Sequence, residues 1–128
     1  MSQDQSKGYI AFELLEGSRE QVLKRFPSRF AVVRADHITY LYGVPGDTEL
    51  PAAAVVVAHA YVCEPGLEAL VVAVNGSTRR IDGSIYHVTL SRDEGRSSVE
   101  SNALVAKDNL WQPVEAFALE TRPVWRKI

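Results

Sequence analysis

Residues 54–74 read AVVVAHAYVCEPGLEALVVAV, two apolar runs with a short polar break between them. The break, Cys63-Glu64-Pro65-Gly66, contains the proline and glycine that favour a tight turn. Valine and other apolar residues dominate both runs, which is typical of strands inside a sheet. We therefore expect Ala54–Val62 and Leu67–Val74 to pair as a β-hairpin.

Four further strand-like runs flank this hairpin. They are rich in β-branched and aromatic residues and are separated by breaks that contain glycine, proline or charged residues. The runs cover residues 9–15, 30–42 (with a turn or bulge at 34–36), 84–91 and 114–120. Together with the hairpin they predict an α+β fold with a largely antiparallel sheet.

Two stretches are predicted to be helical. The first begins near Ser18, which can form a capping box with Gln21, and it ends at Pro27. The second is a short helix over Val99–Lys107. One or two helices of this length complete the predicted α+β fold.

The chain length fits one domain. A chain of 128 residues can bury roughly two-thirds of the surface that its unfolded state exposes. Residues 1–7 are polar and are predicted to form a disordered lead-in, whereas residues 8–128 are predicted to form a single domain. The proline- and glycine-rich segment near 43–53 is expected to act as a hinge or flap between two halves.

Charge and cysteine content narrow the class of function. Fourteen lysines and arginines stand against 16 aspartates and glutamates, and the formal net charge of -2 argues against a long groove for nucleic acid. A single cysteine allows no intrachain disulfide and, with a polar start that lacks a secretory signal, it leads us to expect a cytoplasmic protein. No apolar run approaches the ~18 residues of a membrane span.

Two of the three histidines stand in nearly identical tetrapeptides, His37-Ile38-Thr39-Tyr40 and His87-Val88-Thr89-Leu90. Residues i and i+2 of a strand point to the same face, so each segment presents an imidazole beside a hydroxyl. Ile38 and Val88 then face the core. The structural alternative is two amphipathic strands whose histidines are merely packed and hydrogen-bonded.

This paired H-x-T-x pattern resembles the 2H phosphoesterase superfamily. The residues around and after the second motif, Tyr86–Ser91, Gly95-Arg96 and Val99–Asn102, are similar to the cyclic-phosphodiesterase-like domains of fungal-type tRNA ligases and their bacterial and viral relatives. The resemblance implies a compact, two-lobed fold in which each lobe contributes one motif strand to a central cleft. It also implies metal-independent hydrolysis of 2′,3′-cyclic phosphates, 2′-5′ linkages or related RNA ends, without a cofactor. The motifs are only 50 positions apart (87 minus 37), which implies that the lobes are trimmed.

On this resemblance, His37 and His87 are the general base and the general acid, in an order that the sequence leaves open. Histidine suits both roles because its ordinary pKa of about 6.5 lies near neutral pH. The phosphate oxygens are expected to bind Thr39, Thr89 and Ser91.

Further residues near the motifs are candidates for a substrate rim. They are arginines that could bind phosphate and other side chains that could contact a nucleotide: Arg79, Arg80, Arg92, Arg96, Tyr42, Tyr86 and Asn102. Solvated arginines and packed tyrosines are the alternatives. In a regular strand, Tyr40 and Tyr42 lie on the face opposite His37, because their positions differ from it by odd numbers.

No metal site is predicted. His59 stands apart from the motifs and is expected to be a packed sheet histidine, and no paired-cysteine or H-E-x-x-H spacing occurs. The sequence thus predicts a cytoplasmic cyclic phosphodiesterase that acts on a nucleotide or an RNA terminus, with no membrane partner. The alternatives are a non-catalytic module that binds phosphorylated nucleotides or RNA ends on the same fold, and a subunit that is active only beside a partner domain. The oligomeric state stays open.

Overall fold

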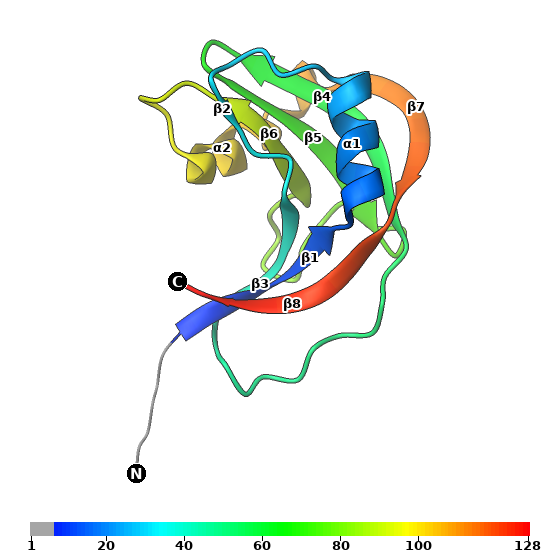
Figure 1. The fold of residues 1–128 in the computed structure, drawn as a ribbon, viewed down its shortest axis with the longest axis vertical. Helices are drawn as coiled ribbons and strands as arrows, with labels where there is room; N and C mark the ends of the chain where they lie inside the picture. Colours follow the sequence, from blue (N-terminus) through cyan, green and yellow to red (C-terminus); the bar gives the residue numbers. More distant parts are fainter. Residues whose placement is uncertain (1–6) are drawn as a thin grey trace.

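The computed structural model describes residues 7–128, and the lead-in predicted over residues 1–7 lies outside them except for Lys7. Figure 1 shows the course of the chain. The strands are β1 (Lys7–Leu14), β2 (Val32–Val33), β3 (His37–Pro45), β4 (Val56–Glu64), β5 (Leu67–Val74), β6 (His87–Arg92), β7 (Gln112–Leu119) and β8 (Thr121–Lys127). The helices are α1 (Glu16–Arg25) and α2 (Ser101–Val105), with short 3₁₀ helices η1 (Ser98–Glu100) and η2 (Asp108–Leu110).

The strands form two antiparallel sheets. The smaller sheet has the order β3-β1-β8, and the larger has the order β2-β6-β5-β4-β7. This mostly antiparallel arrangement with two short helices confirms the predicted α+β class. Within residues 7–128, neither helix has the length and apolar character needed to cross a membrane. Each sheet contains one of the two motif strands, β3 at the edge of the smaller sheet and β6 inside the larger one.

The central hairpin forms as predicted, from β4 and β5. Val56 pairs with Val74 at its open end, and Glu64 pairs with Leu67 at its turn. Gly66 in the turn has a φ of +83°, a conformation that glycine adopts without steric cost. Every residue of β5 is buried, and the strand lies in the middle of the larger sheet.

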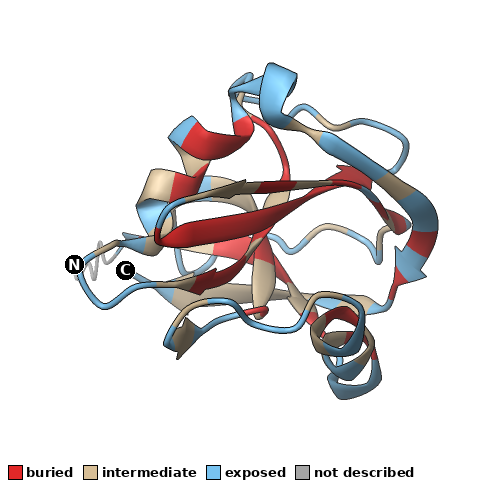
Figure 2. Cartoon of the chain, turned by 90° about the horizontal axis from the view of Figure 1, so that it is seen from above, coloured by how far each residue is buried: buried red, intermediate tan, exposed pale blue. Residues whose placement is uncertain are grey.

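The hydrophobic core joins the two sheets. Phe12 and Ile38 of the smaller sheet pack with Leu70 and Val88 of the larger one, and Val22 of α1 closes the cluster. A second cluster lies on the other face of the larger sheet, beneath α2. Figure 2 shows the buried residues concentrated along the central strands. Ile38 and Val88 therefore face the core, as the alternation of their strands predicts.

The chain passes from the larger sheet to the smaller one at residues 34–36. The N–H of Arg34 donates to the carbonyl of Leu90, and the N–H of Ala35 donates to the carbonyl of Thr89, both at 2.8 Å. Ala35 has a φ of 49°, in the left-handed region, which redirects the chain. The interruption predicted at 34–36 is therefore one of the links between the two sheets.

A second passage between the sheets lies at Glu120, between β7 and β8. The carbonyl of Glu120 accepts from the N–H of Leu15 at 2.9 Å, and its N–H donates to the Ser18 hydroxyl at 2.7 Å. The predicted capping box of Ser18 with Gln21 is therefore wrong. Helix α1 begins at Glu16, and Ser18, already inside the helix, binds the crossing chain instead of capping the helix.

The last strand, β8, is not predicted from the sequence. Its proline, Pro123, lacks the N–H of a regular ladder and weakens the pattern that marks a strand. Nevertheless β8 pairs with β1 from Gly8 to Leu14. The two strands approach closely because position 8 is a glycine: a Cβ there would lie 2.5 Å from the Trp125 ring.

The segment predicted as a hinge or flap, 43–53, begins within a strand, because β3 continues to Pro45. Trp125 holds this end of β3 by donating from Nε1 to the carbonyl of Val44 at 3.1 Å. A turn follows, in which the Thr48 hydroxyl donates to the carbonyl of Pro45 at 2.6 Å. Movement of this segment stays a prediction.

Replacing Ile38 by alanine should destabilise the protein, because this side chain is fully buried where the two sheets meet. We expect a loss of about 2–5 kcal/mol in the free energy of unfolding, measured by urea denaturation. Ile81→Ala is the matched control. Ile81 is 73% exposed, and its replacement should change the free energy by less than about 0.5 kcal/mol. Equal effects of the two substitutions would contradict packing of the sheets through Ile38.

Candidate active site

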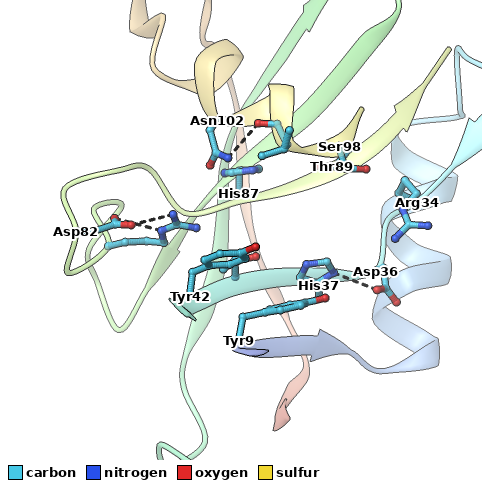
Figure 3. A pocket seen from close by; sticks show the side chains of 13 residues that line it. Tyr9, Arg34, Asp36, His37, Tyr42, Asp82, His87, Thr89, Ser98 and Asn102 are labelled. Atoms are coloured by element: carbon cyan, nitrogen blue, oxygen red, sulfur yellow. Dashed lines mark hydrogen bonds and ion pairs between the residues drawn. The ribbon is translucent and has the colours of Figure 1, made fainter. Parts of the chain in front are cut away.

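A pocket of about 560 Å³ lies where β3 and β6 approach each other (Figure 3). Its wall contains His37 and Thr39 of the first motif and His87 and Thr89 of the second. The two pairs come from different sheets and from distant parts of the sequence. The fold therefore brings together the four motif side chains that the sequence analysis identifies.

A β-bulge lies at the fourth residue of the first motif. Thr39 pairs with Ala11 of β1, and the next pair is Leu41 with Ile10, so Tyr40 is an extra residue in β3. An extra residue shifts the alternation of side chains beyond it. The residues after the bulge therefore face the side opposite to the one expected for a regular strand.

This bulge corrects the expected position of Tyr42. Tyr40 packs in the core against Phe12 and Tyr86, at ring-centroid distances of 5.2 Å and 6.4 Å. Tyr42, one of the candidate rim residues, lines the pocket, although a regular strand would place it on the other face, and its ring stacks on Tyr9 at 6.1 Å. Tyr86 is buried in the core cluster and does not line the pocket, so it takes no part in the predicted rim.

A second bulge lies at the equivalent position of the second motif. Thr89 pairs with Ala69 of β5, and the next pair is Ser91 with Glu68, so Leu90 is the extra residue. In both motifs the threonine lies opposite an alanine, and the fourth residue forms the bulge. The two motif strands thus share a local architecture as well as a sequence pattern.

The second bulge turns Ser91 away from the pocket. Ser91 is fully buried, and its hydroxyl donates to Glu68 at 2.5 Å and accepts from the N–H of Phe30 at 3.3 Å. Glu68 also accepts from the Tyr61 hydroxyl at 2.6 Å, and burial together with this bond raises the pKa of Tyr61. Ser91 therefore belongs to a buried structural cluster, and the predicted contact with phosphate is not available to it.

An ion-pair network holds His37. Its Nδ1 lies 3.0 Å from Oδ2 of Asp36, and Arg126 of β8 donates to the same oxygen at 2.5 Å and to Glu13 at 2.8 Å. Burial lowers the pKa of His37, with a further contribution from Arg126, and outweighs the opposite effect of Asp36. Burial raises the pKa of Asp36, but its bonds with Arg126 and His37 outweigh this and lower the value. Because Nδ1 is engaged, Nε2 is the nitrogen left for a ligand.

A backbone carbonyl holds His87. Its Nδ1 lies 2.8 Å from the carbonyl oxygen of Ile85. Because a carbonyl only accepts, Nδ1 carries the proton of the neutral ring and Nε2 is the free acceptor. Burial lowers the pKa of His87 to about 4, and Arg80 and His37 act in the same direction. Both imidazoles are therefore neutral at pH 7 in the ligand-free protein.

Helix α2 supports the second motif from outside the sheet. Ser101 is fully buried, and its hydroxyl lies 2.9 Å from that of Thr89. Asn102 lines the pocket and donates from Nδ2 to the carbonyl of Val99 at 3.0 Å. Among the described residues, the Oδ1 of Asn102 is buried and has no donor.

Only one of the four predicted rim arginines, Arg80, lines the pocket. Its guanidinium forms an ion pair with Asp82 at 3.0 Å and lowers the pKa of that carboxyl. Arg79 is exposed outside the pocket. Arg92 and Arg96 also lie outside it, so for these three residues the predicted contact with substrate is not supported.

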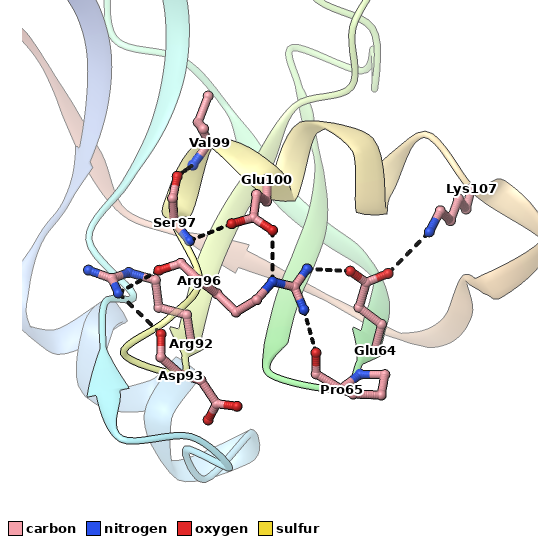
Figure 4. Close-up of polar contacts among 9 residues, drawn as sticks. All are labelled: Glu64, Pro65, Arg92, Asp93, Arg96, Ser97, Val99, Glu100 and Lys107. Atoms are coloured by element: carbon pink, nitrogen blue, oxygen red, sulfur yellow. Dashed lines mark hydrogen bonds and ion pairs between the residues drawn. The ribbon is translucent and has the colours of Figure 1, made fainter.

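Arg96 connects the turn of the central hairpin to the segment before α2 (Figure 4). It donates to Glu64 at 2.5 Å, to Glu100 at 2.7 Å and to the carbonyl of Pro65. Arg92 donates to the carbonyl of Arg96 at 2.7 Å. Both guanidinium groups are therefore engaged in holding loops together.

The remaining pocket residues were missed by sequence reasoning. They lie on β1 and in loops around the motif strands: Tyr9, Arg34, Asp36, Asp82, Ser98 and Val99. Asp36 alone has a sequence signal, because it directly precedes His37 and a neighbouring carboxylate orients an imidazole. The positions of the others depend on strand register and loop conformation. His59 is exposed on β4 and is not packed as predicted.

The pocket carboxylates are engaged by arginines: Asp36 by Arg126 and Asp82 by Arg80. In the described part of the chain, no three histidine, cysteine, aspartate or glutamate side chains are arranged to hold a metal ion. Comparisons of the chain with protein-family models, curated proteins and solved structures find no match. The chemistry of the pocket is therefore inferred from its own side chains.

The lowered pKa of His87 should make the protein less stable in mild acid. The unfolded chain takes up a proton near pH 6.5, whereas folded His87 takes it up only near pH 4, so stability falls as pH decreases through this window. From pH 7 to pH 5 we expect His87 to contribute a loss on the order of 2 kcal/mol in the free energy of unfolding. His37 acts in the same direction.

Urea denaturation of the wild type, His87→Gln and the exposed-site control His59→Gln at several pH values measures this effect. The His87→Gln variant should lose less stability between pH 7 and pH 5, and the control should follow the wild type. Identical pH dependence in all three proteins would show that His87 titrates normally.

Proposed function

We propose that the protein is a metal-independent phosphoesterase of the 2H type, which hydrolyses a cyclic phosphodiester of a nucleotide or an RNA end. The observation that carries the proposal is the meeting of two H-x-T segments, from different sheets, in one pocket. Each histidine is engaged through Nδ1, so both Nε2 atoms remain for proton transfer. Two sheets that each contribute a motif strand also fit the two-lobed arrangement implied by the resemblance.

Opening of a 2′,3′-cyclic phosphate needs one proton to be removed and one to be supplied. A neutral imidazole accepts a proton from water as the water oxygen attacks phosphorus. The bond from phosphorus to one ribose oxygen breaks, and a protonated imidazole on the other side gives that oxygen its proton. The product is a phosphomonoester with a free neighbouring hydroxyl, and the two histidines have exchanged protonation states.

We assign the acid role to His37 and the base role to His87. The Asp36 carboxylate stabilises the protonated form of His37. His87, in contrast, is buried beside a backbone carbonyl, and its pKa is lowered to about 4. A bound phosphodiester brings a negative charge that favours protonation of a nearby imidazole. Since His37 has the carboxylate partner, it takes up this proton more readily.

We assign Thr39 and Thr89 to the non-bridging phosphate oxygens. Both line the pocket beside the histidines, and hydroxyl donors there stabilise the charge that develops during attack. When Ser101 donates to the Thr89 hydroxyl, the proton of Thr89 is free to point at the phosphate. Arg80 adds positive charge to the same wall.

We assign Tyr42 to the nucleobase. Tyr42 is 62% exposed and lines the pocket, and its ring is stacked on the ring of Tyr9. Each of the nucleobases has an aromatic face that can stack on such a ring, so this contact does not select one base over another.

A non-catalytic module that binds phosphorylated nucleotides is the second candidate. The lowered pKa values of His37 and His87 keep both rings neutral, which suits hydrogen bonding to a ligand as well as proton transfer. Such a module would bind the same compounds without converting them. Turnover therefore distinguishes the two candidates, and binding does not.

His37→Ala and His87→Ala should each lower kcat by about 10²- to 10⁴-fold while the fold is retained. The measurement is hydrolysis of 2′,3′-cyclic nucleotides, cyclic-phosphate-ended RNA and 2′-5′-linked oligonucleotides in the presence of EDTA. His59→Ala is the matched control, since His59 is exposed outside the pocket. Binding of nucleotide without turnover by the wild type would favour the binding module, and wild-type rates in both variants would exclude the catalytic assignment.

Tyr42→Ala should raise the KM for a cyclic nucleotide about tenfold or more, because stacking of one base contributes about 1–3 kcal/mol. Tyr42→Phe keeps the aromatic face and should leave KM nearly unchanged. Glycerol cyclic phosphate, which has no base, should be hydrolysed equally by all three proteins. An equal loss on the base-free compound would mean that Tyr42 acts on the reacting groups and not on the base.

A further inference from the structure

Arg34 is a pocket arginine whose charge is not engaged by a neighbour. It is exposed, lines the pocket and contributes to the lowered pKa of His37. Within residues 7–128, its guanidinium makes no ion pair or hydrogen bond, and only its backbone groups are bonded. Arg80, the other arginine in the wall, is paired with Asp82. Among the pocket arginines of the described chain, Arg34 is therefore the one without an anionic partner.

A second hollow of about 690 Å³, which is open to solvent, adjoins the pocket at Arg34. Arg34 and Asp36 line both cavities. The second hollow is also lined by the corner between β1 and α1, Leu14–Glu16, and by Arg19 of α1. Arg19 donates to the carbonyl of Arg34 at 3.2 Å and so fixes the backbone from which the Arg34 side chain extends.

Two of the three carboxylates that line this hollow already form ion pairs with arginines. Glu13 is bonded to Arg122 and to Arg126, each at 2.8 Å, and Asp36 is bonded to Arg126. These bonds lower the pKa of Glu13, which stays charged but is balanced. The charge of Arg34 is thus available to an anion that enters from the pocket.

We propose that Arg34 binds a second phosphate of the substrate. The inference rests on the proposed function, with the reacting phosphate between His37 and His87 and the base on Tyr42. Figure 3 shows Tyr42 and Arg34 on opposite sides of His37, so a nucleotide stacked on Tyr42 extends past the histidines towards Arg34. A guanidinium binds phosphate through paired, charge-assisted hydrogen bonds.

The substrate class is therefore a nucleotide that carries a 5′ phosphate in addition to its cyclic phosphate. That phosphate is a free 5′-monophosphate or the internal phosphodiester of an oligonucleotide end, and the chemistry at Arg34 is the same. One free arginine suits one additional phosphate, in keeping with a chain of net charge -2.

The test compares kcat/KM for adenosine 2′,3′-cyclic phosphate, the same compound with a 5′ phosphate, and a diadenosine that ends in a cyclic phosphate. The wild type should prefer at least one of the two compounds with a second phosphate by about tenfold. Arg34→Gln should abolish this preference through KM, so that the three compounds are hydrolysed with similar kcat/KM. Arg79→Gln, the same change at an exposed arginine outside the pocket, should behave as the wild type.

A preference confined to the diadenosine would identify an oligonucleotide end, and one confined to the 5′-monophosphate a mononucleotide. No preference in the wild type, or an equal loss on all compounds in Arg34→Gln, would overturn the second phosphate site. If the wild type hydrolyses none of them, the proposed function has failed on its own. In that case, calorimetry measures the Kd of adenosine 3′-phosphate with and without a 5′ phosphate, for the wild type and for Arg34→Gln. The phosphate site predicts that the 5′ phosphate lowers the Kd about tenfold in the wild type and not in Arg34→Gln, and an equal Kd for both compounds in the wild type would overturn it.

Discussion

Two backbone hydrogen bonds set the geometry of the candidate site. The N–H groups of Arg34 and Ala35 donate to carbonyls in the strand of the second motif, just before the first motif begins. Their donors and acceptors are main-chain atoms, so the spacing of the two motifs does not depend on the side chains of the pocket. These bonds tie the chain just before His37 to the strand that carries His87.

The same arrangement separates the groups that hold the strands from those that perform chemistry. Ile38 and Val88 pack in one core, while the alternate residues of both strands face the pocket. His37 is supported by a charged network that reaches Arg126 on the last strand, whereas His87 is supported by a carbonyl two residues away. The two imidazoles thus occupy equivalent positions in different electrostatic surroundings, which suits a pair with unlike roles in proton transfer.

Local sequence patterns predicted the central hairpin and the inward faces of the motif strands, because composition and alternation determine both. Alternation gave the wrong face for Tyr42 and Ser91, because the bulges at Tyr40 and Leu90 each insert one extra residue into the strand. A bulge is decided by pairing with a partner strand, which one strand's sequence does not display. The last strand, β8, could not be predicted for a similar reason. It is stabilised by pairing with β1, whereas Pro123 interrupts the strand pattern of its own sequence.

The pairing of β1 with β8 bears on when the pocket can form during synthesis. It joins the first described strand to the last, and the N–H of Ile128 donates to the carbonyl of Lys7 at 3.2 Å. Contacts between residues so far apart in the sequence form slowly, because closing the long loop between them costs conformational entropy. The central hairpin can fold while β8 is still inside the ribosome, but Asp36 then lacks Arg126. A nascent chain therefore carries both motifs well before it carries an assembled site.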